Sequence, residues 1–322
     1  MLHLDLYDRV WLSGKPPVQR LIAEGFLRFD YRNVEIVLEG RERLPEHPVV
    51  LAMNHTDNFN YWPLQYELHR LMRRYTATWV KGKNYESPLV RRFMLVTNNI
   101  PVASRGYVVT RDFLNVMGRR PTADEYRALR DAVDEGGLTD ARAIPRPVLE
   151  QERDMLGRRF WPHRESYAEA VDALMNLFHA RFVEKNREAM RLGLDILVFP
   201  QGTRSVRLSR GHIGIAQLAL HLDVPIVPVG CSGSDLVYPS RSALARPGRI
   251  VYRIGEPMRD WGALRPTEPF APFTRAAESA HRARFQAVVD RVMDAIDGLV
   301  DEPYRYSEDR VSDGTEGTRR FV

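Results

Sequence analysis

The sequence predicts an α/β fold, in which a mostly parallel or mixed central sheet is covered by helices on both faces and carries a helical or loop insertion. Short apolar runs of strand length recur along the chain, and segments with helical periodicity follow them. Two of the runs, residues 49–52 and 196–199, are continuously apolar, as strands buried on both faces of a sheet are. Alternation of this kind is typical of helices packed on a sheet.

The expected elements follow one another from residue 34 to residue 299. The predicted strands are residues 34–38, 49–53, 76–80, 100–102, 195–199, 226–229 and 250–254. The predicted helices are residues 61–74, 87–96, 167–192, 215–222 and 274–299. We therefore expect one large domain, residues 34–300, and no internal repeat.

An amphipathic segment, residues 1–33, precedes the first predicted strand. Apolar positions such as Leu21 and Phe29 are mixed with basic positions such as Arg20 and Arg28. After a pair of prolines, this sequence is compatible with one amphipathic helix, which either lies on a membrane or packs on the domain. Both alternatives are open at this stage.

Residues 107–166 interrupt the alternation and are predicted to form an insertion. They are highly charged and contain four prolines. One short helix is expected inside them, because a capping pattern from Thr122 to Glu125 opens it and the pair Gly136-Gly137 closes it. At the other end of the chain, residues 301–322 have little to bury and are expected to form a flexible tail.

Composition limits the possible partners and compartments. The chain has 322 residues, and its 47 Lys and Arg against 42 Asp and Glu give a net charge of +5, which mildly favours anionic surfaces or phosphorylated ligands. Solvated arginine-rich faces explain the charge equally well, and it does not indicate nucleic acid. Cys231 is the only cysteine, so no intrachain disulfide can form and a cytoplasmic location is expected. No run reaches the ~18 apolar residues of a membrane span, so any membrane contact is expected to be peripheral.

The first polar block, NHTDNFN at residues 54–60, lies between a predicted strand and a predicted helix. A histidine at such a corner is held rigidly and yet exposed at the sheet edge. The imidazole of His55, with an ordinary pKa of about 6.5, can take up and return a proton near neutral pH. The alternative is a turn histidine whose ring bonds to backbone.

The second polar block, FPQGTRS at residues 199–205, also follows a buried strand. Gly202 lets the backbone approach a ligand, Thr203 offers a hydroxyl, and the guanidinium of Arg204 can bind phosphate in a bidentate manner. The block is thus chemically suited to a phosphorylated ligand.

These two blocks resemble the signature blocks of the glycerolipid acyltransferases, the family that includes lysophosphatidic acid acyltransferase. The usual forms in that family are N-H-x-x-x-x-D and F-P-E-G-T-R-S. Residues 224–229, VPIVPV, and residues 255–257, GEP, resemble later family blocks. The resembling blocks lie in the expected order and cover roughly residues 34–260.

The resemblance implies that His55 is the catalytic base and that an acidic residue five positions later orients its ring. Here that position is Asn60, whose carbonyl can accept the imidazole N–H but cannot offset the charge that develops on the ring. Asp57 is an alternative carboxylate, although it can equally serve as a helix cap. Reduced activity is one possible consequence of Asn60.

The resemblance also implies an acceptor site. Residues 100–106, IPVASRG, are similar to the acceptor-binding stretch of the family, with Arg105 aligned as a phosphate ligand beside Arg204 and Ser104 in place of an aspartate. Gln201 stands where the family has glutamate, and with Gly202 and Thr203 it is expected to shape the acceptor site. A changed acceptor or weakened catalysis would follow if that glutamate normally binds an acceptor hydroxyl.

Taken together, the sequence predicts a peripheral enzyme on the cytoplasmic face of the membrane. It would transfer a fatty acyl group from acyl-CoA or acyl carrier protein to a hydroxyl of a lysophosphatidic acid-like acceptor in phospholipid synthesis, with no metal or bound cofactor. One alternative is an aminolipid or glycolipid acceptor, and another is a catalytically weakened lipid-binding relative. Four aromatic residues, Phe59, Tyr61, Trp62 and Tyr66, are expected in the core, or else as the wall of an acyl groove.

Overall fold

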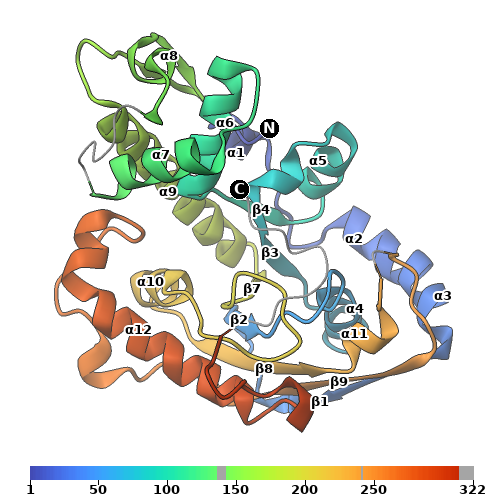
Figure 1. The fold of residues 1–322 in the computed structure, drawn as a ribbon. Helices are drawn as coiled ribbons and strands as arrows, with labels where there is room; N and C mark the ends of the chain where they lie inside the picture. Colours follow the sequence, from blue (N-terminus) through green and yellow to red (C-terminus); the bar gives the residue numbers. More distant parts are fainter. Residues whose placement is uncertain (136–142, 241, 312–322) are drawn as a thin grey trace.

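The computed structural model describes residues 1–135, 143–240 and 242–311, and its centre is a seven-stranded sheet (Figure 1). The strands lie in the order β1-β9-β8-β2-β7-β3-β4. Their bounds are β1 (Val34–Glu39), β2 (Val50–Met53), β3 (Thr76–Lys81), β4 (Asn99–Val102), β7 (Asp195–Val198), β8 (Ile226–Ser232) and β9 (Gly248–Ile254). All seven predicted strands are present, with ends shifted by up to three residues.

The sheet is mixed but mostly parallel. Strands β8 and β9 pair antiparallel, whereas β1 with β9, β2 with β7 and β8, and β3 with β4 and β7 pair parallel. The predicted fold class is therefore confirmed. Because β2, β7, β3 and β4 run in one direction, their carboxyl ends meet at one edge of the sheet, and the polar blocks follow them there.

Helices cover both faces of the sheet, as predicted. The five predicted helices are α4 (Tyr61–Met72), α5 (Pro88–Leu95), α9 (Tyr167–Arg191), α10 (Gly214–Leu222) and α12 (Arg275–Asp297). The shorter helices outside the termini and the insertion are η3 (Arg41–Arg43), η4 (Gly82–Tyr85), α11 (Ser234–Val237) and η6 (Gly262–Leu264).

Two apolar cores result from the alternation of side chains along the buried strands. In β2, Val50 and Ala52 join the core under α9, α10 and α12, whereas Leu51 and Met53 join the core under α4 and the N-terminal helices. All four residues are almost fully buried. Strand β2 is apolar throughout because helices cover both faces of the sheet, so that its side chains are buried on either side.

The insertion forms a helical layer that rises above the sheet edge (Figure 1). It contains α6 (Arg105–Met117), α7 (Ala123–Glu135), α8 (Arg146–Glu150) and a hairpin of β5 (Arg153–Met155) and β6 (Arg158–Phe160). The predicted capping pattern forms around α7, because Glu125 N–H donates to Thr122 Oγ1 at 3.3 Å and Thr122 N–H donates to Glu125 Oε2 at 2.7 Å. The predicted closing pair, Gly136-Gly137, lies outside the described residues.

The N-terminal segment is helical but not one regular helix. After α1 (Leu6–Arg9), the chain forms a continuous run of α2 (Pro17–Leu21), the π-helical turn η1 (Ile22–Leu27), α3 (Arg28–Asp30) and η2 (Tyr31–Asn33). Its inner face buries Ala23, Leu27 and Tyr31, while Leu21 is 73% exposed. The segment therefore packs on the domain and also leaves an apolar side chain in water.

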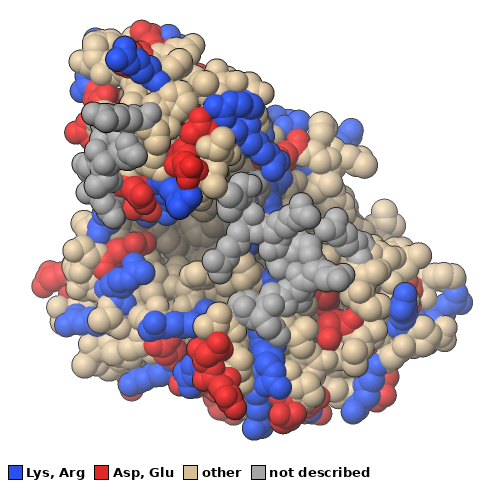
Figure 2. Space-filling model, viewed as in Figure 1, with Lys and Arg blue, Asp and Glu red and all other residues tan. Residues whose placement is uncertain are grey.

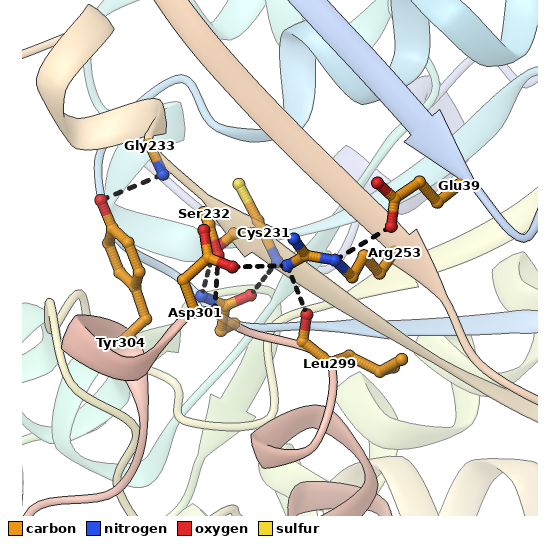
Figure 3. A network of polar contacts seen from close by, with 9 residues as sticks. Glu39, Cys231, Ser232, Gly233, Arg253, Leu299, Asp301 and Tyr304 are labelled. Carbon is orange, nitrogen blue, oxygen red and sulfur yellow. Dashed lines mark hydrogen bonds and ion pairs between the residues drawn. The ribbon is translucent and has the colours of Figure 1, made fainter.

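The predicted tail from Asp301 does not hold for its first residues, which pack on the sheet. Asp301 N–H donates to Ser232 Oγ at 2.9 Å, and its carboxylate accepts from Arg253 at 2.8 Å. The hydroxyl of Tyr304, in η7 (Glu302–Tyr304), accepts from Gly233 N–H at 3.0 Å (Figure 3). The tail was predicted because residues 301–322 are rich in charged side chains. The buried ring of Tyr304 and these polar contacts nevertheless hold the first residues against the sheet.

Candidate active site

His55 lies at the carboxyl end of β2, in the turn that leads to α4. Its ring stacks on Phe199, which follows β7, with 4.0 Å between ring centroids and 18° between ring planes. The backbone of His55 is held by the second block, since its N–H donates to Gln201 Oε1 at 3.2 Å and its carbonyl accepts from Ser205 N–H at 2.9 Å. The two blocks that resemble family signatures are therefore joined around one histidine.

Asn60 orients the ring of His55. The distance between His55 Nδ1 and Asn60 Oδ1 is 3.2 Å, and Asn60 Nδ2 donates to the carbonyl of Asn54 at 2.8 Å. Because the amide nitrogen is engaged by a carbonyl, the amide oxygen faces the ring, and Nδ1 must carry the proton. Nε2 is then the basic nitrogen of His55.

Asp57 has a structural role in the same turn. Its carboxylate accepts from Phe59 N–H at 2.7 Å and from Thr56 Oγ1–H at 2.9 Å. Burial raises the pKa of Asp57 above its ordinary value, and the bonds to the turn lower it. Of the two predicted orienting groups, the structure places Asn60 on the ring and Asp57 on the turn backbone.

The environment of His55 favours the neutral ring. Burial lowers the pKa of His55 to about 3; the bond to Asn60 opposes this shift, and the nearby cations Arg204 and Lys81 add to it. A cation on the ring would be poorly hydrated and would lie near two other cations. His55 is consequently neutral at physiological pH, as a base must be before it accepts a proton.

Gln201 connects the two blocks. It is 2% exposed; its Oε1 accepts from His55 N–H, and its Nε2 donates to Arg207 O and to Ser209 Oγ, each at 3.3 Å. Both ends of the amide are thus engaged within the protein. The structure places Gln201 in the wall that supports the site, rather than at an open surface where an acceptor would touch it.

Arg204 lies in the half-buried turn that follows Gln201, near Lys81. Gly202 opens this turn at φ +67°, and a Cβ there would lie 2.8 Å from the His212 ring, so glycine suits both the backbone and the space. The pKa of Lys81 is lowered, first by the surrounding protein and then by Lys83 and Arg204. Arg204 and Lys81 also act on His55, which places the cations and the ring in one neighbourhood.

Lys81 was missed by the sequence analysis. It is the last residue of β3, which is two positions from β2 in the sheet and parallel to β7. Its position at the end of a predicted strand is typical of site residues in parallel sheets. Its proximity to His55, however, depends on the strand order, which the sequence alone does not give.

Arg105 lies at the start of α6, where Ser104 is the N-cap and accepts from Tyr107 N–H at 3.2 Å. The serine that replaces a family aspartate is therefore used as a helix cap. The guanidinium of Arg105 pairs with Asp172 of α9 at 3.7 Å. Its role as a phosphate ligand beside Arg204 stays a prediction.

An apolar pocket lies behind the site, between α4, α5 and the N-terminal helices. It has a volume of about 50 Å³, and its walls include Ile22, Leu27, Tyr61 and Trp62. Tyr61 contacts the ring of Phe199 with 6.2 Å between centroids, and Phe199 in turn stacks on His55. One aromatic layer thus separates the pocket from the histidine.

Two further searches concern the described part of the chain. Among residues 1–135, 143–240 and 242–311, no group of three or more His, Cys, Asp or Glu side chains has the arrangement of a metal site. None of the helices in those ranges is long and apolar enough to cross a bilayer.

Comparison with known proteins supports the resemblance of the motif blocks. No protein-family model matches the chain. Over 82 residues, 24% of the chain, the sequence is 33% identical to the 1-acyl-sn-glycerol-3-phosphate acyltransferase of Cocos nucifera, and this match spans 27% of that protein's length. A solved structure, the 1-acyl-sn-glycerophosphate (LPA) acyltransferase PlsC from Thermotoga maritima, is 16% identical, with a TM-score of 0.43 over 90% of this chain and 86% of that chain. The relative from Cocos nucifera thus carries the name of an enzyme of the family that the motif blocks resemble.

Proposed function

We propose that the protein is an O-acyltransferase, which transfers a fatty acyl group from a thioester to a hydroxyl of a lysophosphatidic acid-like acceptor. The observation that carries this proposal is the arrangement around His55: a neutral ring, oriented by Asn60 and close to the cations Arg204 and Lys81. The similarity to a named acyltransferase over 82 residues supports it.

The chemistry follows from the tautomer of His55. With Nδ1–H donated to Asn60, Nε2 takes the proton of the acceptor hydroxyl as its oxygen attacks the thioester carbonyl. When the carbon–sulfur bond breaks, the proton passes from Nε2 to the leaving sulfur, so that an ester and a thiol result. Asn60 fixes the ring in this reaction but supplies no negative charge to the imidazolium.

Arg204 and Lys81 would bind the phosphate of the acceptor. Two cations near one histidine suit a dianion, and arginine adds a bidentate fork. A bound phosphate would also offset two of the influences that lower the pKa of His55, and so make the ring a stronger base when the acceptor is present. Arg105 stays a predicted phosphate ligand, although it pairs with Asp172 and lines a second hollow together with His212.

The apolar pocket beside Tyr61 is one aromatic layer from His55, and its volume of about 50 Å³ would admit only a few carbons of the acyl chain, so the rest of the chain would lie along the surface outside it. Exposed Leu21 precedes Ile22, and exposed Leu89 lies one helical turn before Phe93; Ile22 and Phe93 both line this pocket. Arg20 and Arg28 lie close to Leu21 in the chain. We therefore place the enzyme on the cytoplasmic membrane surface, from which a lysolipid can enter. If Leu21→Asn and Leu89→Asn together leave sedimentation with anionic vesicles unchanged, this placement is wrong.

The structure bears on the alternative acceptors as well. An aminolipid or glycolipid acceptor is the alternative that the neutral residues Ser104 and Gln201 favour, because the family has acidic residues at these positions. In the structure, however, Ser104 caps a helix and Gln201 joins two loops. Both replacements thus have a structural explanation that involves no acceptor. The alternative of a weakened lipid-binding relative rests on Asn60 and Gln201, and measurement of turnover decides it.

The test is a panel of acceptors with one acyl-CoA donor. We expect transfer to lysophosphatidic acid and little transfer to monoacylglycerol, which lacks the phosphate. In Arg204→Gln and Lys81→Gln, KM for lysophosphatidic acid should rise about tenfold or more, while the slow transfer to monoacylglycerol is unchanged. If monoacylglycerol or an aminolipid is the better acceptor, the proposed substrate is wrong.

A further inference from the structure

A second hollow lies beside the candidate active site, under the insertion. Its volume is about 650 Å³, and it is bounded by α7 of the insertion, the start of α10 and one face of α12. Figure 2 shows it as a depression between the inserted helices and the helices below them, with charged side chains at its rim. Its size falls within the range of about 300–1,000 Å³ that is common for small-molecule sites.

Arginines dominate the lining of this hollow. Arg105, Arg130, Arg275 and Arg282 line it, together with the carboxylates of Asp134 and Glu278. Arg130 pairs with Asp134 at 2.5 Å, whereas Arg282 lies 3.8 Å from Glu278 and is 70% exposed. Arg130 belongs to α7 and Arg282 to α12, so the hollow has an arginine from each of two helices in its lining.

Arg275 fixes the geometry of the hollow. It pairs with Asp172 of α9 at 2.5 Å and donates to the carbonyls of Asp134, at 2.8 Å, and Val133. The end of α7 is thereby tied to the start of α12, the two helices that carry Arg130 and Arg282. Asp172 also pairs with Arg105, so four arginines face three carboxylates in this region and the cations are in excess.

The wall of the hollow contains a strained aromatic residue. Phe273, just before α12, has φ +67°, a conformation that residues other than glycine rarely adopt. Its N–H is held by Gln217 Oε1 at 2.5 Å. The ring of Phe273 packs against Phe182 and His179, each with 5.4 Å between ring centroids, and it also lines the hollow. The arginine-lined site therefore has an apolar ring in its wall.

The hollow and the candidate active site share a loop. His212, which lines the hollow, donates its N–H to Pro200 O at 2.8 Å, and its ring packs against Gly202. Gly202 and Arg204 belong to the same turn. A ligand that fills the hollow is therefore adjacent to the turn from which Arg204 extends toward the neighbourhood of His55.

We propose that this hollow binds the phosphate groups of a nucleotide-linked acyl thioester, that is, the adenosine phosphate end of acyl-CoA. Arg130 and Arg282 bind phosphate, and the ring of Phe273 contacts the adenine. The inference rests on the proposed function, because it assigns the donor of that reaction. A concave site of this size fits a compact polyphosphate, whereas a carrier protein would need a broad outer surface.

Direct binding tests the hollow without any turnover. Adenosine 3′,5′-bisphosphate, titrated calorimetrically into the full chain, should bind to wild type, and Arg130→Gln with Arg282→Gln should weaken binding tenfold or more. The matched control is Arg284→Gln, an exposed arginine on α12 that does not line the hollow, and it should change Kd less than twofold. Absent binding, or equal binding by wild type and the double variant, would overturn the inference.

Kinetics separate this inference from the proposed function. The double variant should raise KM for acyl-CoA about tenfold with little change in kcat, and should leave transfer from acyl-pantetheine, which has no phosphate, unaltered. If wild type transfers from acyl carrier protein but not from acyl-CoA, the inference is wrong and the proposed function stands. If wild type transfers from no thioester but binds the bisphosphate through Arg130 and Arg282, the proposed function is wrong and the hollow remains a phosphate site.

Discussion

At the residue scale, two amides define the candidate active site, and each uses its donor and its acceptor. Asn60 accepts from His55 Nδ1–H and donates to Asn54 O, while Gln201 accepts from His55 N–H and donates to Arg207 O. A carboxylate at either place could accept but not donate. The two amides that replace family carboxylates are therefore suited to this site, because each donates an N–H to a nearby backbone carbonyl.

Asn60→Asp tests this match. The new carboxylate would be fully buried and would face the carbonyl of Asn54, so we expect a loss of about 1–3 kcal/mol in the free energy of unfolding. It should also raise the pKa of His55, because an anion next to the ring favours the imidazolium. Urea unfolding and NMR titration of the ring measure the two effects. Asn58→Asp, in the same turn, is the control, and unchanged stability in Asn60→Asp would contradict the account.

Gln201→Glu is expected to damage the site rather than to restore a family feature. The glutamate would place an acceptor against the carbonyl of Arg207, and at a buried position this is expected to destabilise the fold by about 1–3 kcal/mol. Exposed Gln151→Glu is the matched control. A Gln201→Glu enzyme that is as stable as wild type and faster in acyl transfer would contradict this structural role of Gln201.

The pH dependence follows from the lowered pKa of His55. With a pKa of about 3 the ring stays neutral from pH 8 down to pH 5, so kcat/KM should show no acid limb from His55 in that range. Because the unfolded chain binds this proton near pH 6.5 and the folded chain does not, stability from His55 decreases as pH falls below about 6.5. An acid limb with a midpoint near 6.5 that disappears in His55→Ala would contradict the half-buried, neutral ring.

At the element scale, the sequence predicted what local periodicity encodes. The seven strands and five helices were identified because each carries its own apolar pattern. Helix α6 was missed because it begins inside the motif that contains Arg105, and the insertion was read as charged although Val108, Val109 and Phe113 of this helix are fully buried. The β5–β6 hairpin was not predicted either, because each of its strands has only three residues and is too short to show a periodic pattern. Contacts with other parts of the folded chain stabilise it.

One such contact can be removed. Arg153 of β5 donates to both carboxylate oxygens of Asp112 on α6, at 2.8 and 2.6 Å, and both side chains are buried. Arg153→Ala leaves the carboxylate uncompensated and should destabilise the insertion by about 3–5 kcal/mol. Hydrogen exchange of α6 amides reads this out locally.

Arg159→Ala is the control for that experiment. Arg159 lies in the same hairpin, but its partner Glu152 and its own side chain are largely exposed, so the change should be below about 1 kcal/mol. Equal effects of the two substitutions would mean that the buried pair does not hold the hairpin on α6.

At the scale of the whole molecule, the strand order brings together site residues that lie far apart in the sequence. The motif blocks indicated His55, Asn60 and Arg204, but Lys81 joins them because β3 lies beside β7 in the sheet. The hollow under the insertion has the same origin, since its walls come from α7, α10 and α12. Strand order and helix packing depend on long-range contacts that no single segment encodes.

The central claim is that His55, neutral and held by an amide, is the base of an acyl transfer at this sheet edge. Its most direct measurement is the rate of lysophosphatidic acid acylation by wild type, His55→Ala and the exposed control His163→Ala, with folding of each variant checked by circular dichroism. We predict that His55→Ala is slower by about 10²-fold or more and that His163→Ala matches wild type. A folded His55→Ala enzyme that acylates at the wild-type rate would contradict the account.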